Sequence, residues 1–170
     1  ITHSMSWALA KCPEFLKAVV AAVVPVVAYP EETVILNQQY TADTGITDIE
    51  VTDYQTFHVI FEAKRGWGLP GAEQLTKYSI RKDFAASGAA NKVIVTLSEC
   101  TETYAGLYLP FQSVNGIPVK HLPWSRVYEL AEQSKTASNH EQKHLLTESQ
   151  ETHGIWSMYP VVLPAAPVQR

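Results

Sequence analysis

Two acidic residues and a lysine stand at matching positions of two β-rich runs. The runs are residues 47–52 (TDIEVT) and 57–63 (FHVIFEA), and the short polar segment between them predicts a hairpin. A turn at the centre of that segment places Asp48 opposite Glu62. Lys64 lies two positions after Glu62, on the same face of its strand and roughly 7 Å further along. The sequence therefore predicts two carboxylates and an ammonium group at one end of the hairpin.

This combination of side chains suits a divalent metal. Opposed side chains in an antiparallel pair have Cβ atoms about 4.5 to 5.5 Å apart, and like charges there are destabilising unless something compensates them. Two carboxylates with open coordination positions suit Mg²⁺, which keeps several waters and binds substrate phosphates. Such an ion polarises a phosphodiester and activates a bound water, while a nearby lysine stabilises the developing charge. We expect hydrolysis that depends on Mg²⁺ or Mn²⁺.

The pattern resembles that of the PD-(D/E)xK nucleases, which have a restriction-endonuclease-like fold. Asp48, followed after an apolar strand by Glu62-Ala63-Lys64, matches the D…(D/E)-x-K signature, with Thr47 in place of the usual Pro. Gln74-Leu75-x-x-Tyr78 is similar to the Q-L-x-x-Y element of the exonuclease-type branch. The similarity covers about residues 14–98. It implies an α/β fold, with a mixed sheet flanked by helices, and a metal-dependent nuclease that acts on DNA.

The resemblance also implies roles for single residues. Asp48 and Glu62 would bind the metal together with the carbonyl of Ala63. Lys64 would be the catalytic lysine and Gln74 a supporting residue. Many relatives add an acid from the first helix, and Glu14 stands in that place here, with Glu31 and Glu32 as competitors.

Basic and aromatic residues close to this motif could contact a nucleic acid. Helical spacing puts Gln74, Lys77, Tyr78 and Arg81 on one face. A tryptophan in the glycine-rich loop at 65–71 (RGWGLPG) could stack on a base. The expected nucleic-acid contacts are Arg65, Trp67, Lys77, Tyr78 and Arg81.

Three alternatives compete with the nuclease hypothesis. E-x-K is a frequent chance pattern, so the three charged residues could be a surface cluster. The chain could instead be a non-catalytic nuclease-like module that binds nucleic acid or protein, because fold alone does not determine function. His140-Glu141-Gln142-Lys143-His144 matches the H-E-x-x-H pattern of zinc peptidases. Its extended form fails, since Thr147 stands where Gly is needed and Gln150 where the third His is needed.

The elements that must position these residues alternate between helix and strand. A helix from Pro13 ends at Pro25, and a strand at 33–40 and a turn at 42–45 follow it. After the hairpin come a helix at 72–86 and a short buried strand at 92–97. We expect one domain over 1–170, with a core at about 13–123. A C-terminal extension would carry helices at about 125–133 and 141–152, and an extended arm from 159 to 170.

Composition excludes several classes of protein. The 170 residues carry a formal charge of −4 and are 46% apolar, which argues against a disordered chain and against a broad basic surface for nucleic acid. Cys12 and Cys100 form no C-x-x-C pair and favour buried thiols in a reducing, cytoplasmic compartment. The apolar stretch at 18–28 is too short to span a membrane. A homodimer would give the two active sites that duplex cleavage requires.

Overall fold

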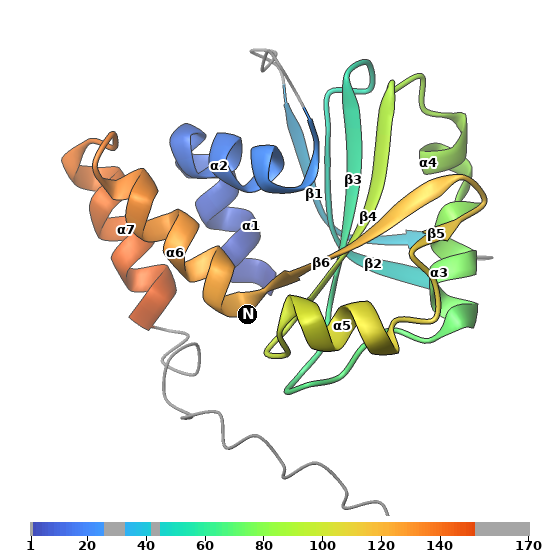
Figure 1. Ribbon diagram of the computed structural model, residues 1–170. Coiled ribbons are helices and arrows are strands. Elements are labelled where there is room, and N and C mark those ends of the chain that lie inside the picture. The colour runs from blue at the N-terminus through green and yellow to red at the C-terminus, as the bar shows by residue number, and fades with distance from the viewer. Residues whose placement is uncertain (1, 26–32, 42–44, 152–170) are drawn as a thin grey trace, which may run out of the picture.

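The protein, described here by a computed structural model, has an α/β architecture with helices on both faces of a mixed sheet (Figure 1). The structure describes residues 2–25, 33–41 and 45–151. The strands are β1 (Val34–Thr41), β2 (Gly45–Thr52), β3 (Phe57–Ala63), β4 (Asn91–Ser98), β5 (Ser113–Val114) and β6 (Ile117–Pro123). The helices are α1 (Thr2–Lys11), α2 (Pro13–Val23), α3 (Ala72–Ser79), α4 (Lys82–Ala86), α5 (Glu102–Tyr108), α6 (Trp124–Lys135) and α7 (His140–Glu151).

The sheet has the order β1-β2-β3-β4-β6-β5, and its first three strands form an antiparallel meander. β4 and β6 run parallel to β3, and β5 pairs antiparallel with β6. The expected hairpin register is confirmed, because Ile49 pairs with Phe61 and Val51 with Val59. Continuing that register places Asp48 opposite Glu62.

Asp53 shapes the turn that sets this register. Its Oδ1 accepts hydrogen bonds from the amides of Gln55, Thr56 and Phe57, at 3.1, 2.8 and 2.9 Å. Tyr54 takes a left-handed conformation with φ 62°. Aspartate side chains favour such turns because they bond to the backbone a few residues ahead. The turn therefore explains why the local sequence specified the pairing of β2 with β3.

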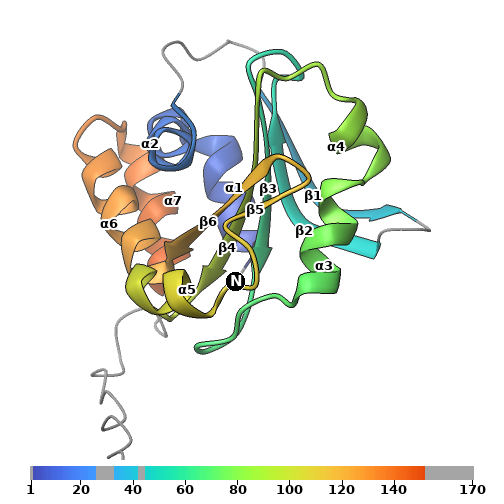
Figure 2. The same ribbon diagram turned by 45° about the vertical axis from the view of Figure 1, so that its right-hand side comes forward.

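The two faces of the sheet build separate cores. Ile49, Val51, Val59 and Phe61 pack in the core cluster on one face, which α1, α2, α6 and α7 cover. Ile60 points to the other face and packs with residues of α3 and α4 in a second cluster. Side chains alternate between faces along a strand, so Asp48, Glu50 and Glu62 share the face that α3 and α4 cover. Figure 2 shows the four helices on one side of the sheet and α3 and α4 on the other.

The C-terminal helices belong to the main core. Val127 and Leu130 of α6 and Leu146 of α7 lie in the same cluster as Phe15 of α2. The core therefore does not end near residue 123, and α6 and α7 are not an appended extension. The expected arm at 159–170 and most of the expected turn at 42–45 lie outside the described residues.

The expected single helix over 72–86 is two helices. α3 ends at Ser79, Arg81 adopts φ −55° and ψ 126°, and α4 begins at Lys82. This break lets the Arg81 side chain turn inward, where it is 2% exposed. Four elements were not anticipated from the sequence: α1, α5, β5 and β6.

The two cysteines are buried free thiols, as expected. The apolar residues Val19, Val20 and Val23 of α2 face the core, and the helix ends before Pro25. Among the described residues, every helix is too short or too polar to cross a bilayer. The apolar stretch that begins at residue 18 is thus core structure as far as it is described.

Candidate active site

Asp48 lies where β2 and β3 separate. The ladder between the two strands ends at the pair Ile49–Phe61, although β2 continues to Gly45 alongside β1. Beyond that pair, Asp48 Oδ2 accepts a hydrogen bond of 2.8 Å from the amide of Ala63. A carboxylate here takes the place of a backbone carbonyl and satisfies a strand-end amide. The contact holds the Asp48 carboxylate beside the chain segment that carries Glu62 and Lys64.

Glu62 is 4% exposed and receives three donors. Tyr78 Oη lies 2.6 Å from Oε2, and Gln74 Nε2 donates to Oε1 at 2.7 Å. The third donor is Lys64 Nζ, 2.7 Å from Oε1. Hydrogen bonds to an ionised group are stronger than neutral ones, and a buried carboxylate without them would be costly. The three contacts allow a charged carboxylate to sit at a nearly buried position.

Tyr78 bridges the two separated strands. Its hydroxyl lies 2.9 Å from the carbonyl of Ile46 and also accepts a hydrogen bond of 2.9 Å from Gln74 Nε2. The hydroxyl has one proton to donate, and the Glu62 carboxylate is a stronger acceptor than the Ile46 carbonyl because it is charged and closer. The Tyr78 hydroxyl therefore donates to Glu62. Burial raises the pKa of Tyr78, and the hydrogen bond and negative charge of Glu62 raise it further. Tyr78 is therefore a neutral donor that orients Glu62 and does not itself act as a base.

Lys64 reaches from the buried carboxylate to solvent. Its side chain is 31% exposed, and its amide donates to the carbonyl of Leu97 at the end of β4. A lysine ammonium group carries three donor hydrogens, and the contact with Glu62 uses one. The others remain for a water or an anion at the surface, so the Lys64 ammonium group contacts Glu62 and is also accessible to solvent.

The donor set fits a magnesium-type ion. Asp48 Oδ1 accepts no hydrogen bond from the described residues, and Glu62 Oε2 has a lone pair beyond the one used by Tyr78. Within the described ranges, no three His, Cys, Asp or Glu side chains form a metal-binding group. An ion at this site would rely on two carboxylates, the Ala63 carbonyl and water, which is the ligand set that Mg²⁺ tolerates.

A buried charge network adjoins the site on the same sheet face. Glu50 Oε1 forms an ion pair with Arg81 Nε at 3.0 Å and accepts a hydrogen bond of 2.6 Å from Thr47 Oγ1. His58 Nε2 donates to Glu50 Oε2 at 3.2 Å, since a carboxylate can only accept. Arg81 Nη1 also donates to the carbonyl of Gly45 at 3.1 Å. The network fastens the junction of α3 and α4 to the part of β2 that carries Asp48.

Burial by itself would raise the pKa of Glu50. The hydrogen bonds from His58 and Thr47 and the positive charge of Arg81 outweigh burial, so the pKa of Glu50 lies below its ordinary value. Glu50 is therefore ionised at neutral pH. Sequence reasoning did not identify this network, although Glu50 follows Asp48 by two residues and so had to share its face.

The structure revises the expected nucleic-acid contacts. Arg81 and Tyr78 are each 2% exposed and are engaged by Glu50 and Glu62, so neither side chain is available at the surface. Lys77 faces solvent and pairs with Glu73 at 2.7 Å. Of the expected contacts, Arg65 is exposed and Trp67 is partly exposed, both in the loop that follows Lys64.

Glu14 lies away from the two acids. Its Oε1 contacts Lys17 Nζ at 2.9 Å on the outer side of α2. The inner side of that helix packs Phe15 against the sheet face opposite to Glu62. The structure therefore does not bring Glu14 to the site, and Glu31 and Glu32 lie outside the described residues.

The H-E-x-x-H residues occupy the exposed side of α7. His140, Glu141 and His144 are exposed, and His144 Nδ1 lies 3.5 Å from Glu148 Oε1. No third ligand joins them among the described residues. An open helix surface neither excludes water nor shapes a substrate pocket, so this motif has none of the surroundings that zinc peptidase chemistry needs.

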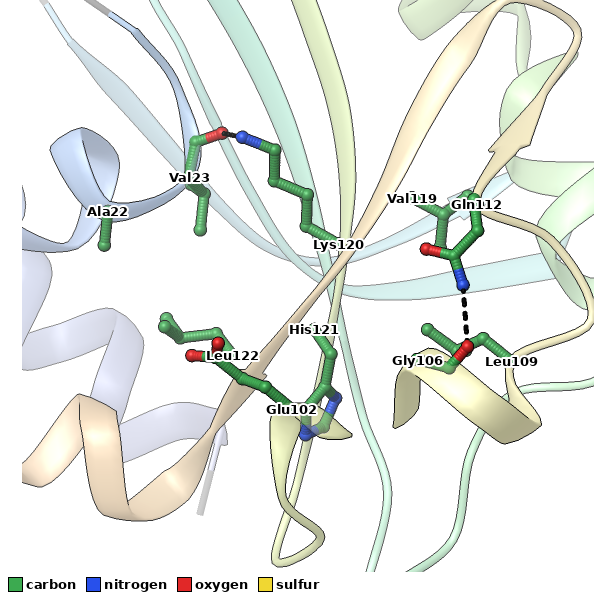
Figure 3. Close-up of a pocket in the computed structure, with 10 residues that line it drawn as sticks. All are labelled: Ala22, Val23, Glu102, Gly106, Leu109, Gln112, Val119, Lys120, His121 and Leu122. Carbon is green, nitrogen blue, oxygen red and sulfur yellow. Dashed lines mark hydrogen bonds between the residues drawn. The ribbon is translucent and has the colours of Figure 1, made fainter. Parts of the chain in front are cut away.

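A cavity of about 290 Å³ lies along the open edge of β6, between α2 and α5 (Figure 3). Lys120 reaches the carbonyl of Val23 at 2.7 Å on one side of it, and His121 lines another side. His121 Nε2 donates to the carbonyl of Cys100 at 3.0 Å, which leaves Nδ1 to accept from Thr96 Oγ1 at 2.8 Å. Burial lowers the pKa of His121. His121 is thus a neutral structural residue and not a base for the Cys100 thiol.

Comparisons with known proteins identify no relative. No family model, curated protein or solved structure matches the chain. The α/β class with a mixed sheet follows from the structure itself. Any functional assignment therefore depends on the sequence motif and on the geometry around Asp48, Glu62 and Lys64.

Proposed function

We propose that this protein is a metal-dependent nuclease of the PD-(D/E)xK type, with a restriction-endonuclease-like fold, that hydrolyses phosphodiester bonds in DNA. One observation carries the proposal. Asp48 bonds to the amide of Ala63 at 2.8 Å, directly beside Glu62, whose Oε1 contacts Lys64 Nζ at 2.7 Å. Two acids and a lysine from a divergent strand pair are the constellation that the sequence motif requires.

Asp48, Glu62 and the Ala63 carbonyl would hold the ion. Mg²⁺ or Mn²⁺ in this position would polarise a phosphodiester and lower the pKa of a bound water. Tyr78 and Gln74 fix the orientation of the Glu62 carboxylate through their contacts of 2.6 and 2.7 Å. A ligand whose rotamer is fixed in advance needs little reorganisation during the reaction.

Lys64 would act on the substrate. Its partly exposed ammonium group can donate to a phosphate oxygen and stabilise the negative charge that develops in the transition state. The neighbouring Arg65 is exposed and could contact the next phosphate. DNA as the substrate rests on the family resemblance, and a homodimer would supply the second site needed to cut both strands of a duplex.

Cleavage assays test this proposal. Linear, circular and single-stranded DNA are incubated with Mg²⁺, Mn²⁺ or EDTA and with wild type, Asp48→Asn or Lys64→Ala. We expect metal-dependent cleavage by wild type and a loss of at least about 100-fold in both variants. Lys82→Ala, which removes an exposed positive charge from α4, is the matched control and should cleave normally. Wild-type activity in both site variants would contradict the proposal, and DNA binding without any cleavage would favour a non-catalytic module.

A further inference from the structure

Three aromatic rings form a row next to the candidate active site. The rings of Trp67 and Tyr104 meet edge to face, with centroids 4.9 Å apart. Tyr104 and Tyr108, one turn apart on α5, have centroids 4.4 Å apart and planes inclined by 36°. Tyr108 is 63% exposed, so the outer end of the row is open to solvent. Large aromatic side chains contribute most when they are buried, so the exposed ring of Tyr108 is a candidate contact for a ligand.

The row begins at the loop that carries the catalytic lysine. Trp67 is three residues after Lys64, and the amide of Glu99 donates to the carbonyl of Gly66 at 2.8 Å. This bond ties the loop after β3 to the segment that leads from β4 into α5. β3 and β4 are parallel, so both segments lie at the same edge of the sheet, and α5 lies at that edge in Figure 1. The rings therefore form a fixed extension of the candidate site.

The acidic residue at the start of α5 disfavours contact with a phosphate backbone and favours contact with an uncharged part of a ligand. The first turn of the helix carries Glu102, and Thr101 caps it by accepting a hydrogen bond from the amide of Tyr104. A phosphate backbone laid along this helix would meet a carboxylate. A base face carries no charge and stacks on an aromatic ring with little dependence on sequence.

We propose that Trp67, Tyr104 and Tyr108 form a platform for the unpaired bases of a single-stranded polynucleotide whose backbone enters the site at Lys64. This inference rests on the proposed function and deepens it, because it names single strands, or single-stranded ends, as the substrate class. Bases within a duplex are stacked on each other and cannot offer their faces to Tyr108. A single strand can place a base on Tyr108 while its next phosphates approach Lys64.

Binding measurements without metal test this inference separately from cleavage. A labelled oligothymidylate and a blunt duplex are titrated with the protein in EDTA at one stated salt concentration, followed by fluorescence anisotropy. Tyr108→Leu, which keeps an apolar side chain but removes the ring, should weaken oligothymidylate binding by about 5- to 100-fold. Tyr108→Phe should bind like wild type. Leu107→Ala is the control, because Leu107 directly precedes Tyr108 and is 74% exposed but has no ring that could stack on a base.

The outcomes separate the two proposals. Weaker single-strand binding by Tyr108→Leu, with Tyr108→Phe and Leu107→Ala unaffected, supports the platform even if no cleavage is found. Equal binding by Tyr108→Leu and wild type overturns it even if Lys64→Ala abolishes cleavage. Equal losses in Tyr108→Leu and Leu107→Ala also overturn it, since they would indicate a general apolar surface suited to a protein partner. Tighter binding of the blunt duplex than of the single strand would overturn the assigned substrate class.

Discussion

The buried ion pair between Arg81 and Glu50 allows the sharpest test of the architecture around the site. Both side chains are about 2% exposed, and Arg81 Nε lies 3.0 Å from Glu50 Oε1. Arg81→Met keeps much of the side-chain volume but removes the positive charge and the donor to the Gly45 carbonyl. Glu50 would then be a buried carboxylate with only Thr47 and His58 as polar partners among the described contacts.

Arg81→Met should lower the free energy of unfolding strongly, because the Glu50 carboxylate remains buried without its charged partner. Removing one partner of a buried ion pair costs about 3 to 5 kcal/mol, whereas replacing both partners can be nearly neutral. With a urea m-value of about 1 to 3 kcal/mol/M, the unfolding midpoint should fall by at least about 1 M. Combining Arg81→Met with Glu50→Gln removes both charges and keeps an acceptor for His58, so it should recover about 2 kcal/mol or more.

Urea unfolding followed by circular dichroism measures these effects. Arg126→Met is the matched control, because Arg126 pairs with Glu129 at 2.7 Å on an exposed part of α6. An exposed pair is worth less than about 1 kcal/mol, so its midpoint should hardly change. If Arg81→Met and Arg126→Met shift the midpoint equally, or if the double variant is no more stable than Arg81→Met alone, the buried ion pair between Arg81 and Glu50 does not stabilise the fold.

Three further predictions concern the Tyr78 hydroxyl, the Glu50 carboxylate and the histidines of α7. Tyr78→Phe should lower the free energy of unfolding in urea by about 1.5 to 3 kcal/mol, because it removes a hydrogen-bond donor to the buried Glu62. Its cleavage rate should fall while the sheet core stays intact. Unchanged stability would count against this hydrogen bond. The pKa of Glu50 in the folded protein lies below its ordinary value of 4.5. The stabilisation that ionised Glu50 provides is therefore fully present above pH 4.5 and is lost as the pH falls through the folded-state pKa. Unfolding free energies measured down the acid range should therefore fall less steeply in Glu50→Gln than in wild type, and parallel curves would refute this assignment. Replacing His140 and His144 by Ala should leave cleavage unchanged and stability within about 0.5 kcal/mol, because both are exposed; bound zinc that is lost in the variant together with an activity would reverse this conclusion.

The sequence by itself determined the hairpin and the alignment of its acids. The turn needs only local information, because Asp53 bonds to three amides within four residues of itself. Alternation along a strand then assigns Asp48 and Glu62 to one face without knowledge of what covers it. The separation of Glu62 and Lys64 by one residue likewise places both on that face. Short-range geometry was therefore sufficient to bring the two acids and the lysine to one face, and the order of helices and strands along the chain indicated the α/β class.

Only the tertiary structure decided which partners those side chains meet. Helical spacing put Gln74, Tyr78 and Arg81 on one face, but it could not show that this face packs on the sheet and buries Arg81 against Glu50. The break between α3 and α4 has the same origin, since the break lets the arginine reach a carboxylate 31 residues earlier in the chain. The aromatic row joins Trp67 to α5, a helix that the sequence did not predict. Propensity and periodicity describe neighbours along the chain, whereas these contacts depend on strands and helices that meet only after the sheet has formed.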